Sequence, residues 1–456
     1  MKRTLADFAK ECGGRLRGAD QGFAGVSSDT RTLKPGELFV ALRGPRFNAN
    51  EFVSAAQTAG AAGAIVDSEQ TVALSQVIVQ DTQAALECSG RAWRNQFSLP
   101  LIGVGGSNGK TTAKEMTATI LAQAGSCLAT RGNLNNHIGV PLTLLRIEPT
   151  NRFAVIEMGA NSAGDVAALV RTARPTVGLI TNAGAEHLEG FGSLEGVARA
   201  EGEMVEGLAA EATAVINADD EFAALWRGLT RARVVTFGIE KAADFAAADI
   251  RTTIGADGFV THFTLNSPLG TGTAIELQMG GRHNVSNALA AAAAAGAAGA
   301  TLKHVVAGLA AVRAVPGRLQ LKKAASGAWL IDDSYNANPS SVRAGIEVLA
   351  SLEGRKWLVL GDMAELGEYS QSSHAEVGEF ARQRGIERLY ATGALAAVAV
   401  ESFGPGGKWF AEAAQLAQAL SVATPDVRML VKGSRVNRLE RVVDALVGAT
   451  NKTGGG

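Results

Sequence analysis

The sequence predicts an α/β protein of three domains. Its 456 residues are too many for one ordinary hydrophobic core, since domains average roughly 150 residues. Short apolar runs alternate with helical patterns along most of the chain, as in open sheets covered by helices. Changes of pattern divide the chain into a small N-terminal α/β module at 1–85, a central, mostly parallel sheet at 86–313 and a C-terminal open α/β sheet at 314–456.

The composition is that of a folded protein without a global charge. Hydrophobic residues make up 46% and charged residues 19%, and 43 basic side chains face 44 acidic ones. A net charge of -1 gives no field that attracts nucleic acid or an anionic membrane, so neither is an expected partner. The start of the chain lacks the apolar core of a signal peptide and no stretch approaches a membrane span, so we expect a cytoplasmic monomer.

The cysteines point to no redox or metal chemistry. Cys12, Cys88 and Cys127 are far apart and odd in number, which suits neither a disulfide framework nor a ligand cluster. We interpret them as buried or idle thiols.

The N-terminal module contains three short β-type runs, Glu37 to Leu42, Ala64 to Asp67 and Gln76 to Asp81. A polar segment precedes them and ends at a Pro-Gly turn. By composition it is an ordinary polar loop, and its candidate binding residues are Ser28, Asp29, Thr30 and Arg31.

The central region alternates strands with helical patterns, which indicates a parallel sheet with both faces covered. From about 245 to 280 the pattern becomes strand-rich. An Ala-rich run, 288–300, is predicted to be a buried helix and not a membrane span, because alanine favours helices but has low hydrophobicity and two glycines interrupt the run. The expected strands are Phe153 to Met158, Val177 to Asn182, Thr213 to Ala218 and Ala232 to Gly238.

The strongest motif is the segment VGGSNGKTT at 104–112, between a strand and a helix. Glycines let backbone N–H groups face a polyphosphate, Lys110 can neutralise phosphate charge, and Thr111 can offer a hydroxyl to Mg²⁺. The usual P-loop spacing would place a glycine at Val104, whereas Gly105 and Gly106 come later. We interpret the segment as a short phosphate loop in a P-loop-type sheet; the alternative is a tight turn with a surface lysine.

Two polar residues follow consecutive strands of this sheet. Glu157 ends the strand at 153–158, and His187 follows the strand at 177–182. Because parallel strands present their carboxyl ends at one edge, a carboxylate and an imidazole can converge on one Mg²⁺ there. Taken singly, Glu157 is either a metal ligand or a helix cap, and His187 is an unremarkable loop histidine.

Asparagines concentrate at two further places. Asn133, Asn135 and Asn136 precede a helix, where their amides serve either a ligand or the turn itself. Asn284 and Asn287 are three residues apart, on one face at the start of the Ala-rich helix, where they cap the helix or face a ligand.

The C-terminal domain is expected to be Rossmann-like. It begins after Pro316 and Gly317 with Arg318, a cation at the hinge between two sheets. A strand then leads to Asp333 and to the polar turn of Tyr335, Asn336 and Asn338, before a helix whose expected cap is Ser340 or Ser341. Lys432 ends a later strand, where it either binds an anionic group or is a surface lysine.

With GKTT after a strand, polar residues at strand ends and Tyr-Asn-Ala-Asn-Pro-Ser at 335–340, the chain resembles the Mur ligase superfamily, which also contains folylpolyglutamate synthases. The 335–340 segment, with GDMAELGEYSQSSH and VKGSR, resembles the branch that adds D-alanyl-D-alanine. The resemblance implies an ATP- and Mg²⁺-dependent ligase that activates the carboxylate of UDP-N-acetylmuramoyl-tripeptide as an acyl phosphate for attack by the dipeptide amine, in peptidoglycan synthesis.

The resemblance also implies roles for individual residues. Lys110, His187, Arg318 and Glu201 would be catalytic, and Thr111, Glu157, His187 and Glu201 would bind metal. ATP would contact Gly106, Ser107, Asn108, Gly109, Lys110, Thr111, Thr112, His283, Asn284, Asn287, Arg318 and Asp333. Substrates would contact Ser28, Asp29, Thr30 and Arg31 through UDP, and Asn133, Asn135, Asn136, Tyr335, Asn336 and Asn338 elsewhere.

Two departures from the family pattern stand out. Glu201 occupies a position where the superfamily usually carries a carbamoylated lysine that binds a second Mg²⁺. The glutamate either holds that metal directly or joins Glu203 and Glu206 on a solvated helix face. Asn48 and Asn50 stand where the family often has an acidic residue and a histidine, which puts any role of those positions in doubt.

Two other functions compete with this one. A nucleotide switch that binds a partner protein would leave the two further α/β domains and the Asn-rich turns unexplained. A folylpolyglutamate-type ligase would normally lack the N-terminal module and the 335–339 segment. The sequence leaves open whether the third residue of the tripeptide is lysine or diaminopimelate.

Overall fold

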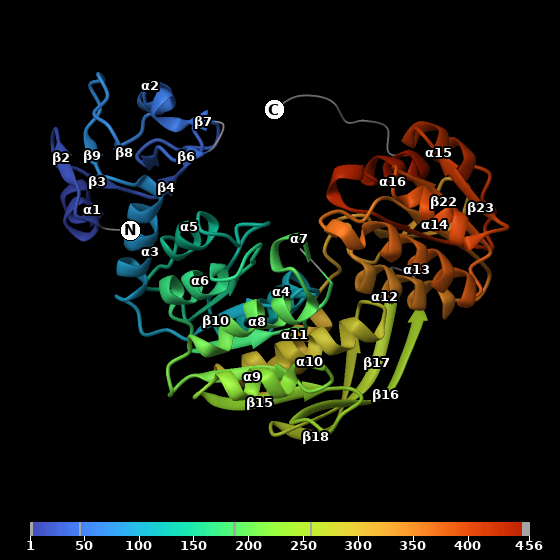
Figure 1. Cartoon of the computed structure of the whole chain (residues 1–456). Coiled ribbons are helices and arrows are strands. Elements are labelled where there is room, and N and C mark those ends of the chain that lie inside the picture. The colour runs from blue at the N-terminus through green and yellow to red at the C-terminus, as the bar shows by residue number, and fades with distance from the viewer. Residues whose placement is uncertain (1–2, 45–46, 186–187, 256–257, 449–456) are drawn as a thin grey trace.

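The computed structural model describes residues 3–44, 47–185, 188–255 and 258–448, and His187 lies outside them. Figure 1 shows three α/β units that follow one another along the chain. The predicted α/β class is confirmed by three sheets of five, nine and six strands. No helix of the described residues is both long and apolar enough to span a membrane.

The N-terminal unit is a five-stranded sheet in the order β2-β9-β8-β5-β4, with only β2 antiparallel to its neighbour. Thr4 and Asp7 form a capping box at the start of α1, and Gly13 ends that helix at φ 65°. The elements are α1 (Leu5–Cys12), β2 (Arg15–Arg17), β4 (Val26–Ser27), β5 (Leu38–Val40), η1 (Ala49–Phe52), α2 (Val53–Thr58), β8 (Gly63–Val66), β9 (Gln76–Ile78) and the antiparallel pairs β1 (Arg3–Thr4) with β3 (Gly22–Phe23) and β6 (Arg43–Gly44) with β7 (Phe47–Asn48).

Helix α3 (Thr82–Arg94) connects the first unit to the second. Asp81 caps its start by accepting from the backbone N–H groups of Gln83 and Ala84. One apolar core runs from α1 through α3 into the central unit, because Trp93 is buried in the same cluster as Phe8. The division predicted at 85–86 falls within this helix.

The central sheet has nine strands in the order β11-β12-β10-β13-β14-β15-β16-β17-β18. It is parallel from β11 to β16 and continues as the antiparallel β16-β17-β18, so the strand-rich segment extends the same sheet. The strands are β10 (Leu101–Gly105), β11 (Cys127–Ala129), β12 (Phe153–Glu157), β13 (Val177–Ile180), β14 (Thr213–Asn217), β15 (Arg233–Gly238), β16 (Phe245–Ile254), β17 (Phe259–Ser267) and β18 (Gly270–Leu277).

Helices cover both faces of the parallel part of this sheet, which is why β10, β12 and β13 are buried at every position. Ile102 and Val104 face a core shared with α4, α10 and α11, whereas Leu101 faces a core shared with α3, α6 and α8. The Ala-rich run is a buried helix, as predicted, and its alanines let α10 lie close to α4. The helices are α4 (Lys110–Ala122), α5 (Gly139–Leu144), α6 (Asp165–Ala173), α7 (Leu188–Phe191), α8 (Leu194–Glu206), α9 (Ala223–Leu229), α10 (Arg282–Ala297) and α11 (Leu302–Ala311).

The C-terminal sheet has six strands in the order β19-β20-β24-β21-β22-β23, all parallel except β19. One face packs on α12, α13 and α14 and the other on α15 and α16. The elements are β19 (Gln320–Lys323), β20 (Trp329–Asp333), α12 (Pro339–Ala350), β21 (Arg355–Leu360), η2 (Gly367–Tyr369), α13 (Ser370–Gln383), β22 (Arg388–Thr392), α14 (Ala396–Phe403), β23 (Gly407–Phe410), α15 (Ala413–Leu420), β24 (Val427–Lys432), η3 (Arg435–Asn437) and α16 (Glu440–Val447).

The cap predicted for α12 was wrong. Asn338, rather than Ser340 or Ser341, is the N-cap, and its Oδ1 accepts from the Ser341 N–H at 2.8 Å. Pro339 then occupies the first helical position, where a missing N–H costs nothing.

Candidate active site

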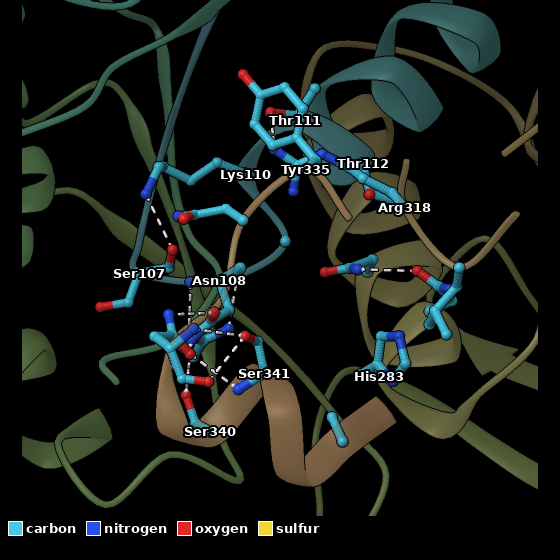
Figure 2. Close-up of a pocket in the computed structure, with 18 of the residues that line it drawn as sticks. Ser107, Asn108, Lys110, Thr111, Thr112, His283, Arg318, Tyr335, Ser340 and Ser341 are labelled. Atoms are coloured by element: carbon cyan, nitrogen blue, oxygen red, sulfur yellow. Dashed lines mark hydrogen bonds between the residues drawn. The ribbon is translucent and has the colours of Figure 1, made fainter. Parts of the chain in front are cut away.

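A cavity of about 450 Å³ lies between the central and C-terminal units. Its wall combines the phosphate loop, the start of α10 and the first turns of the C-terminal unit, as Figure 2 shows. Most of the residues expected to bind ATP or metal line this cavity, although they come from segments more than 300 residues apart.

The phosphate loop joins β10 to α4 and needs glycine at two positions. Gly106 has φ 112° and Gly109 has φ 82°, both in a region that L side chains rarely adopt. A Cβ at Gly106 would lie 2.1 Å from Thr181 Oγ1, and one at Gly109 would lie 2.3 Å from Asn287 Oδ1. The segment is therefore a close-packed loop, and its lysine, Lys110, is half-buried on the cavity wall instead of lying on the surface.

The end of β13 holds this loop from the other side. Asn182 Oδ1 accepts from the Asn108 N–H at 3.0 Å, and its Nδ2 donates to the Asn108 carbonyl at 2.9 Å. Thr181 Oγ1 donates to the same carbonyl at 2.7 Å. Sequence reasoning missed both residues, and the available signal was their polar character at the end of an apolar strand.

The side chains after the loop are directed to the cavity (Figure 2). Lys110 Nζ donates to the Ser107 carbonyl at 3.0 Å. Thr111 Oγ1 accepts from Arg318 Nη2 at 3.2 Å. Ser107, Asn108, Gly109 and Thr112 also line the cavity, whereas Gly106 lies behind them.

Glu157 lies at the carboxyl end of β12 and lines the cavity, although it is only 2% exposed. Its Oε1 accepts from Asn135 Nδ2 at 2.9 Å, and its buried Oε2 has no hydrogen-bond partner among the described residues. The cap alternative fails because the next helix, α6, begins at Asp165 after Gly164. A buried carboxylate oxygen that lacks a partner, on a side chain that lines a cavity, suits a cation.

The three asparagines before α5 separate into two roles. Asn133 and Asn135 line the cavity. Asn136 does not: its Oδ1 accepts from the N–H groups of Ile138 and Gly139, so the turn alternative holds for it.

Glu201 lies on α8 and is 6% exposed, so it is not part of a solvated face. Its Oε2 accepts from the Gly106 N–H at 2.6 Å, which places the carboxylate directly beneath the phosphate loop. Glu203 is also engaged, since it accepts from the N–H groups of Gly164 and Ala167, whereas Glu206 is exposed. No three carboxylate, imidazole or thiol groups of the described residues cluster as a metal site, but the predicted partner His187 is outside them.

The start of α10 forms the opposite wall of the cavity. Asn284 Nδ2 donates to the Gly280 carbonyl at 2.7 Å, and Asn287 Nδ2 donates to Asn284 Oδ1 at 3.3 Å. Burial lowers the pKa of His283 to about 4. The negative charge of nearby Asp333 works against this shift, and the positive charge of Lys432 adds to it. At neutral pH this imidazole is therefore uncharged and can face a neutral ring.

The C-terminal unit closes the cavity with a charged pair. Asp333 Oδ1 accepts from the Leu319 N–H at 3.1 Å, and its Oδ2 accepts from Lys432 Nζ at 2.6 Å. Lys432 also donates to the Asn336 carbonyl at 2.9 Å and is 3% exposed. The surface-lysine alternative therefore fails.

Arg318 and Tyr335 are stacked at the mouth of this unit. The Arg318 guanidinium carbon lies 4.5 Å from the centre of the Tyr335 ring, while Tyr335 remains 37% exposed. A cation held over a ring face is attracted by the negative quadrupole of that face. The hinge arginine is thus held between Thr111 of one unit and Tyr335 of the other (Figure 2).

A second direct link between the units runs through Asn108. Asn338 Nδ2 donates to Asn108 Oδ1 at 2.8 Å, and Asn108 Nδ2 donates to Ser340 Oγ at 3.0 Å. The phosphate loop is therefore hydrogen-bonded to the N-terminus of α12, some 230 residues away.

The predicted UDP-binding residues are not brought to this cavity. They lie in the N-terminal unit, between β4 and β5. Arg31 lowers the pKa of Asp29 to about 2 by hydrogen bonding, and Arg31 Nη2 lies 2.7 Å from Asp29 Oδ2. Asn50 donates to Asn48 and to Asp67, so those two asparagines maintain the local fold. Ser28 and Thr30 belong to the same loop.

The cysteines are free thiols, as predicted. Cys12 donates to the Ala85 carbonyl and Cys88 to the Glu11 carbonyl, each at 3.1 Å. Burial raises the pKa values of Cys12 and Cys127 to about 12, so both stay protonated at neutral pH.

Comparison with known proteins agrees with this architecture. The Mur ligase middle domain matches residues 104–295, and the Mur ligase glutamate ligase domain matches residues 317–435. The chain is 44% identical to UDP-N-acetylmuramoyl-tripeptide--D-alanyl-D-alanine ligase of Escherichia coli K12, over 97% of this chain and 98% of that protein.

Solved structures give the same result. MurF of Acinetobacter baumannii superposes with a TM-score of 0.91 at 32% identity, over 98% of this chain and 99% of that one. The MurF ligase of Thermotoga maritima in complex with ADP has a TM-score of 0.82 at 27% identity, over 93% of this chain and 97% of that one. Since both family models fall on the two units that enclose the cavity, and the full-length relatives also include the N-terminal unit, the chain belongs to the Mur ligase family.

Proposed function

We propose that the chain is the ATP-dependent ligase that joins D-alanyl-D-alanine to UDP-N-acetylmuramoyl-tripeptide, giving the peptidoglycan pentapeptide precursor, ADP and phosphate. The observation that carries the proposal is the cavity in which the phosphate loop, Glu157 and Arg318 meet the Tyr335 to Asn338 segment. Full-length similarity to a ligase of that name supports the same reaction.

ATP would lie with its polyphosphate on the loop from Gly106 to Thr112. Backbone N–H groups and the dipole of α4 favour an anion there, and Lys110 would turn from the Ser107 carbonyl to the phosphates. The adenine would lie against His283, Asn284 and Asn287, where the neutral imidazole suits an uncharged ring. The ADP complex of the Thermotoga maritima ligase supports this use of the nucleotide.

The residues present fit Mg²⁺. Thr111 and Glu157 would supply oxygen ligands from the cavity wall. His187 and Glu201 complete the proposed set, with Glu201 beneath the phosphate loop. When bound, Mg²⁺ would neutralise the charge that develops on the transferring phosphoryl group. Glu201 already is a carboxylate, so we expect no carbamoylated lysine.

The chemistry proceeds in two displacements. A carboxylate oxygen of the tripeptide attacks the γ-phosphorus, the bond to ADP breaks, and an acyl phosphate forms. The dipeptide amine then attacks the acyl carbon, the amine loses a proton, and phosphate leaves. Arg318 would stabilise charge in the first step, and closure of the C-terminal unit would keep water from the acyl phosphate.

Binding of the substrates would divide between the three units. Ser28, Asp29, Thr30 and Arg31 of unit 1–85 would hold the UDP group. In unit 86–313, Asn133 and Asn135 would adjoin the tripeptide, whereas Asn136, which was also expected to do so, holds its own turn. In unit 314–456, Tyr335, Asn336 and Asn338 would adjoin the dipeptide, and Asp333 would lie near ATP. We also predict a cytoplasmic location, because ATP is the cosubstrate. A monomeric state stays a prediction.

The competing functions have weaker support. Folylpolyglutamate synthase of Mycobacterium tuberculosis is 18% identical, with a TM-score of 0.62 over 81% of this chain, so that likeness concerns the fold alone. A nucleotide switch would not need a cavity closed by a third unit. Neither accounts for the N-terminal unit, which the Escherichia coli ligase shares.

The test is phosphate release from ATP by the purified full chain with UDP-N-acetylmuramoyl-tripeptide and Mg²⁺. D-alanyl-D-alanine should stimulate release and appear in the pentapeptide by mass spectrometry. Glutamate with a folate, offered as control substrates, should give no stimulation. Absence of stimulation by the dipeptide would overturn the assignment.

A further inference from the structure

A buried lysine on α4 has no place in the chemistry described so far. Lys114 lies one turn beyond Lys110 and is 0% exposed. Its Nζ donates to the Thr130 carbonyl at 3.0 Å and is paired with Glu115, whose side chain is 43% exposed. Burying an ammonium is costly unless it is paired and hydrogen-bonded, and an apolar side chain would fill the same space without that cost.

The acceptor of Lys114 is itself bonded to the proposed metal ligand. Thr130 is 2% exposed and follows β11 directly. Its N–H donates to the Val155 carbonyl at 3.0 Å, and its Oγ1 accepts from the Glu157 N–H at 3.0 Å. One residue therefore contacts the buried ammonium through its carbonyl and the backbone of Glu157 through its hydroxyl.

The same segment also reaches the carboxylate of Glu157. Asn135, five residues after Thr130, donates to Glu157 Oε1 at 2.9 Å, and its carbonyl accepts from the Gly159 N–H at 2.9 Å. With Oε1 held in this way, the buried Oε2 is left without a hydrogen-bond partner among the described residues, on a side chain that lines the cavity. The orientation of the Glu157 carboxylate therefore depends on the position of the segment from Thr130 to Asn135.

We propose that Lys114 is a positioning residue, which fixes the Thr130 to Asn135 segment on α4 and so orients Glu157 Oε2 toward a divalent cation. The inference rests on the proposed function, since that function assigns Glu157 to the metal. α4 begins at the phosphate loop. Its first turn therefore carries Lys110 of the phosphate site, and its second turn carries Lys114, which would orient the Glu157 carboxylate.

The alternative is that Lys114 only joins α4 to β11. The two ideas differ in what a substitution changes: a purely structural contact affects unfolding, whereas a positioning contact also affects affinity for the cation. Groups that orient a metal ligand typically contribute about 10- to 100-fold to metal affinity.

The first measurement is Mn²⁺ binding to the full chain in the presence of ADP, followed by the electron paramagnetic resonance signal of free Mn²⁺. The second is the Mg²⁺ concentration that gives half of the maximal ligase rate. Lys114→Met and Thr130→Val should each weaken Mn²⁺ binding about 10-fold or more and raise the Mg²⁺ requirement, with most of kcat restored at saturating Mg²⁺. Thr130→Ser, which keeps the hydroxyl, should bind Mn²⁺ like the unaltered protein.

Thr117→Val is the matched control. Thr117 is also fully buried on α4, and its hydroxyl donates to the Ala113 carbonyl of the same helix. The substitution should therefore lower stability and leave Mn²⁺ affinity unchanged. A folded Lys114→Met that binds Mn²⁺ within about threefold of the unaltered protein would overturn the proposal. Should that variant fail to fold, equal Mn²⁺ affinities of Thr130→Val and Thr130→Ser would overturn it instead. These affinities need no dipeptide, so their outcome is independent of the ligase test.

Discussion

Thr111 Oγ1 accepts a hydrogen bond from Arg318 Nη2 at 3.2 Å, across 207 residues of sequence. Thr111 is the second residue of α4 in the central unit, and Arg318 follows the linker into the C-terminal unit. The contact brings the hinge arginine to the end of the phosphate loop. In this arrangement Arg318 donates to the hydroxyl that is proposed to bind Mg²⁺, so we expect its guanidinium to move toward the phosphates when the nucleotide binds.

Replacing Arg318 with lysine should lower kcat about 100-fold, because removal of one preorganised donor to a developing charge typically has that effect. A lysine keeps the charge but not the planar fork that can bond a phosphoryl group through two nitrogens. Phosphate release and the thermal midpoint should be measured together. Arg313→Lys is the control and should retain activity, because Arg313 is an exposed arginine of the same linker that donates to the Ala310 and Val312 carbonyls. A kcat of Arg318→Lys equal to that of the control would remove Arg318 from the mechanism.

Tyr335→Leu should lower kcat about fivefold, because the ring that holds the Arg318 guanidinium contributes on the order of 1 kcal/mol. Tyr335→Phe keeps the ring and should retain most of the activity. The measurement is kcat and the KM for the dipeptide. If the phenylalanine variant were as impaired as the leucine variant, the hydroxyl would be the important group and Tyr335 would act on substrate instead.

Asn338→Ala should raise the KM for D-alanyl-D-alanine, because it removes the bond from α12 to Asn108 in the phosphate loop. It also removes the N-cap of α12, which typically costs about 1 kcal/mol of stability. Ser341→Ala is the matched control, since it breaks the reciprocal bond of the same cap without touching Asn108. Equal KM values for the two variants would show that the link between the units has no part in binding.

Glu201→Gln should reduce the rate about tenfold at limiting Mg²⁺ and much less at high Mg²⁺, if its charge helps to hold a second cation. Glutamine can still accept from the Gly106 N–H, so the support of the phosphate loop remains. Glu201→Ala loses both and should be worse at every Mg²⁺ concentration. The rate of the unaltered enzyme should not change with added bicarbonate. A glutamine variant with a normal Mg²⁺ profile would leave Glu201 only the role of loop support.

His283→Gln should make the protein less sensitive to acid. Burial lowers the pKa of His283 to about 4, so between its ordinary value near 6.5 and about 4 the unfolded chain binds a proton that the folded chain does not. The stability that depends on the neutral imidazole is therefore fully present above pH 6.5 and is lost as the pH falls, by about 2.5 kcal/mol at pH 4.5.

Urea midpoints of the unaltered protein and His283→Gln at pH 7 and pH 4.5 test this effect, since the difference between the two proteins isolates His283 from the carboxylates. Equal losses of stability in both proteins would contradict it. His304→Gln, at an exposed cap of α11, should behave like the unaltered protein.

Much of the architecture could be read from local pattern. Apolar runs bounded by turns located the strands, because a strand buried on both faces must be apolar throughout. The phosphate loop could also be predicted, because its glycines lie close together between a strand and a helix. The structure agrees, since Gly106 and Gly109 adopt positive φ and leave no room for a Cβ. The cap of α12 was misread because Ser340 and Ser341 are as good capping residues as Asn338, and only the backbone path distinguishes them.

The sequence by itself therefore determined the α/β class, the phosphate loop and the polar strand ends, because these depend on residues close together in the chain. The tertiary structure alone decided which of the polar residues meet. In it Asn182 bonds Asn108, and Glu201 lies beneath Gly106. Arg318 bonds Thr111, whereas Asn136 bonds only within its own turn among the described residues. Such contacts depend on how strands align and how two units pack, and short-range pattern carries no information about either.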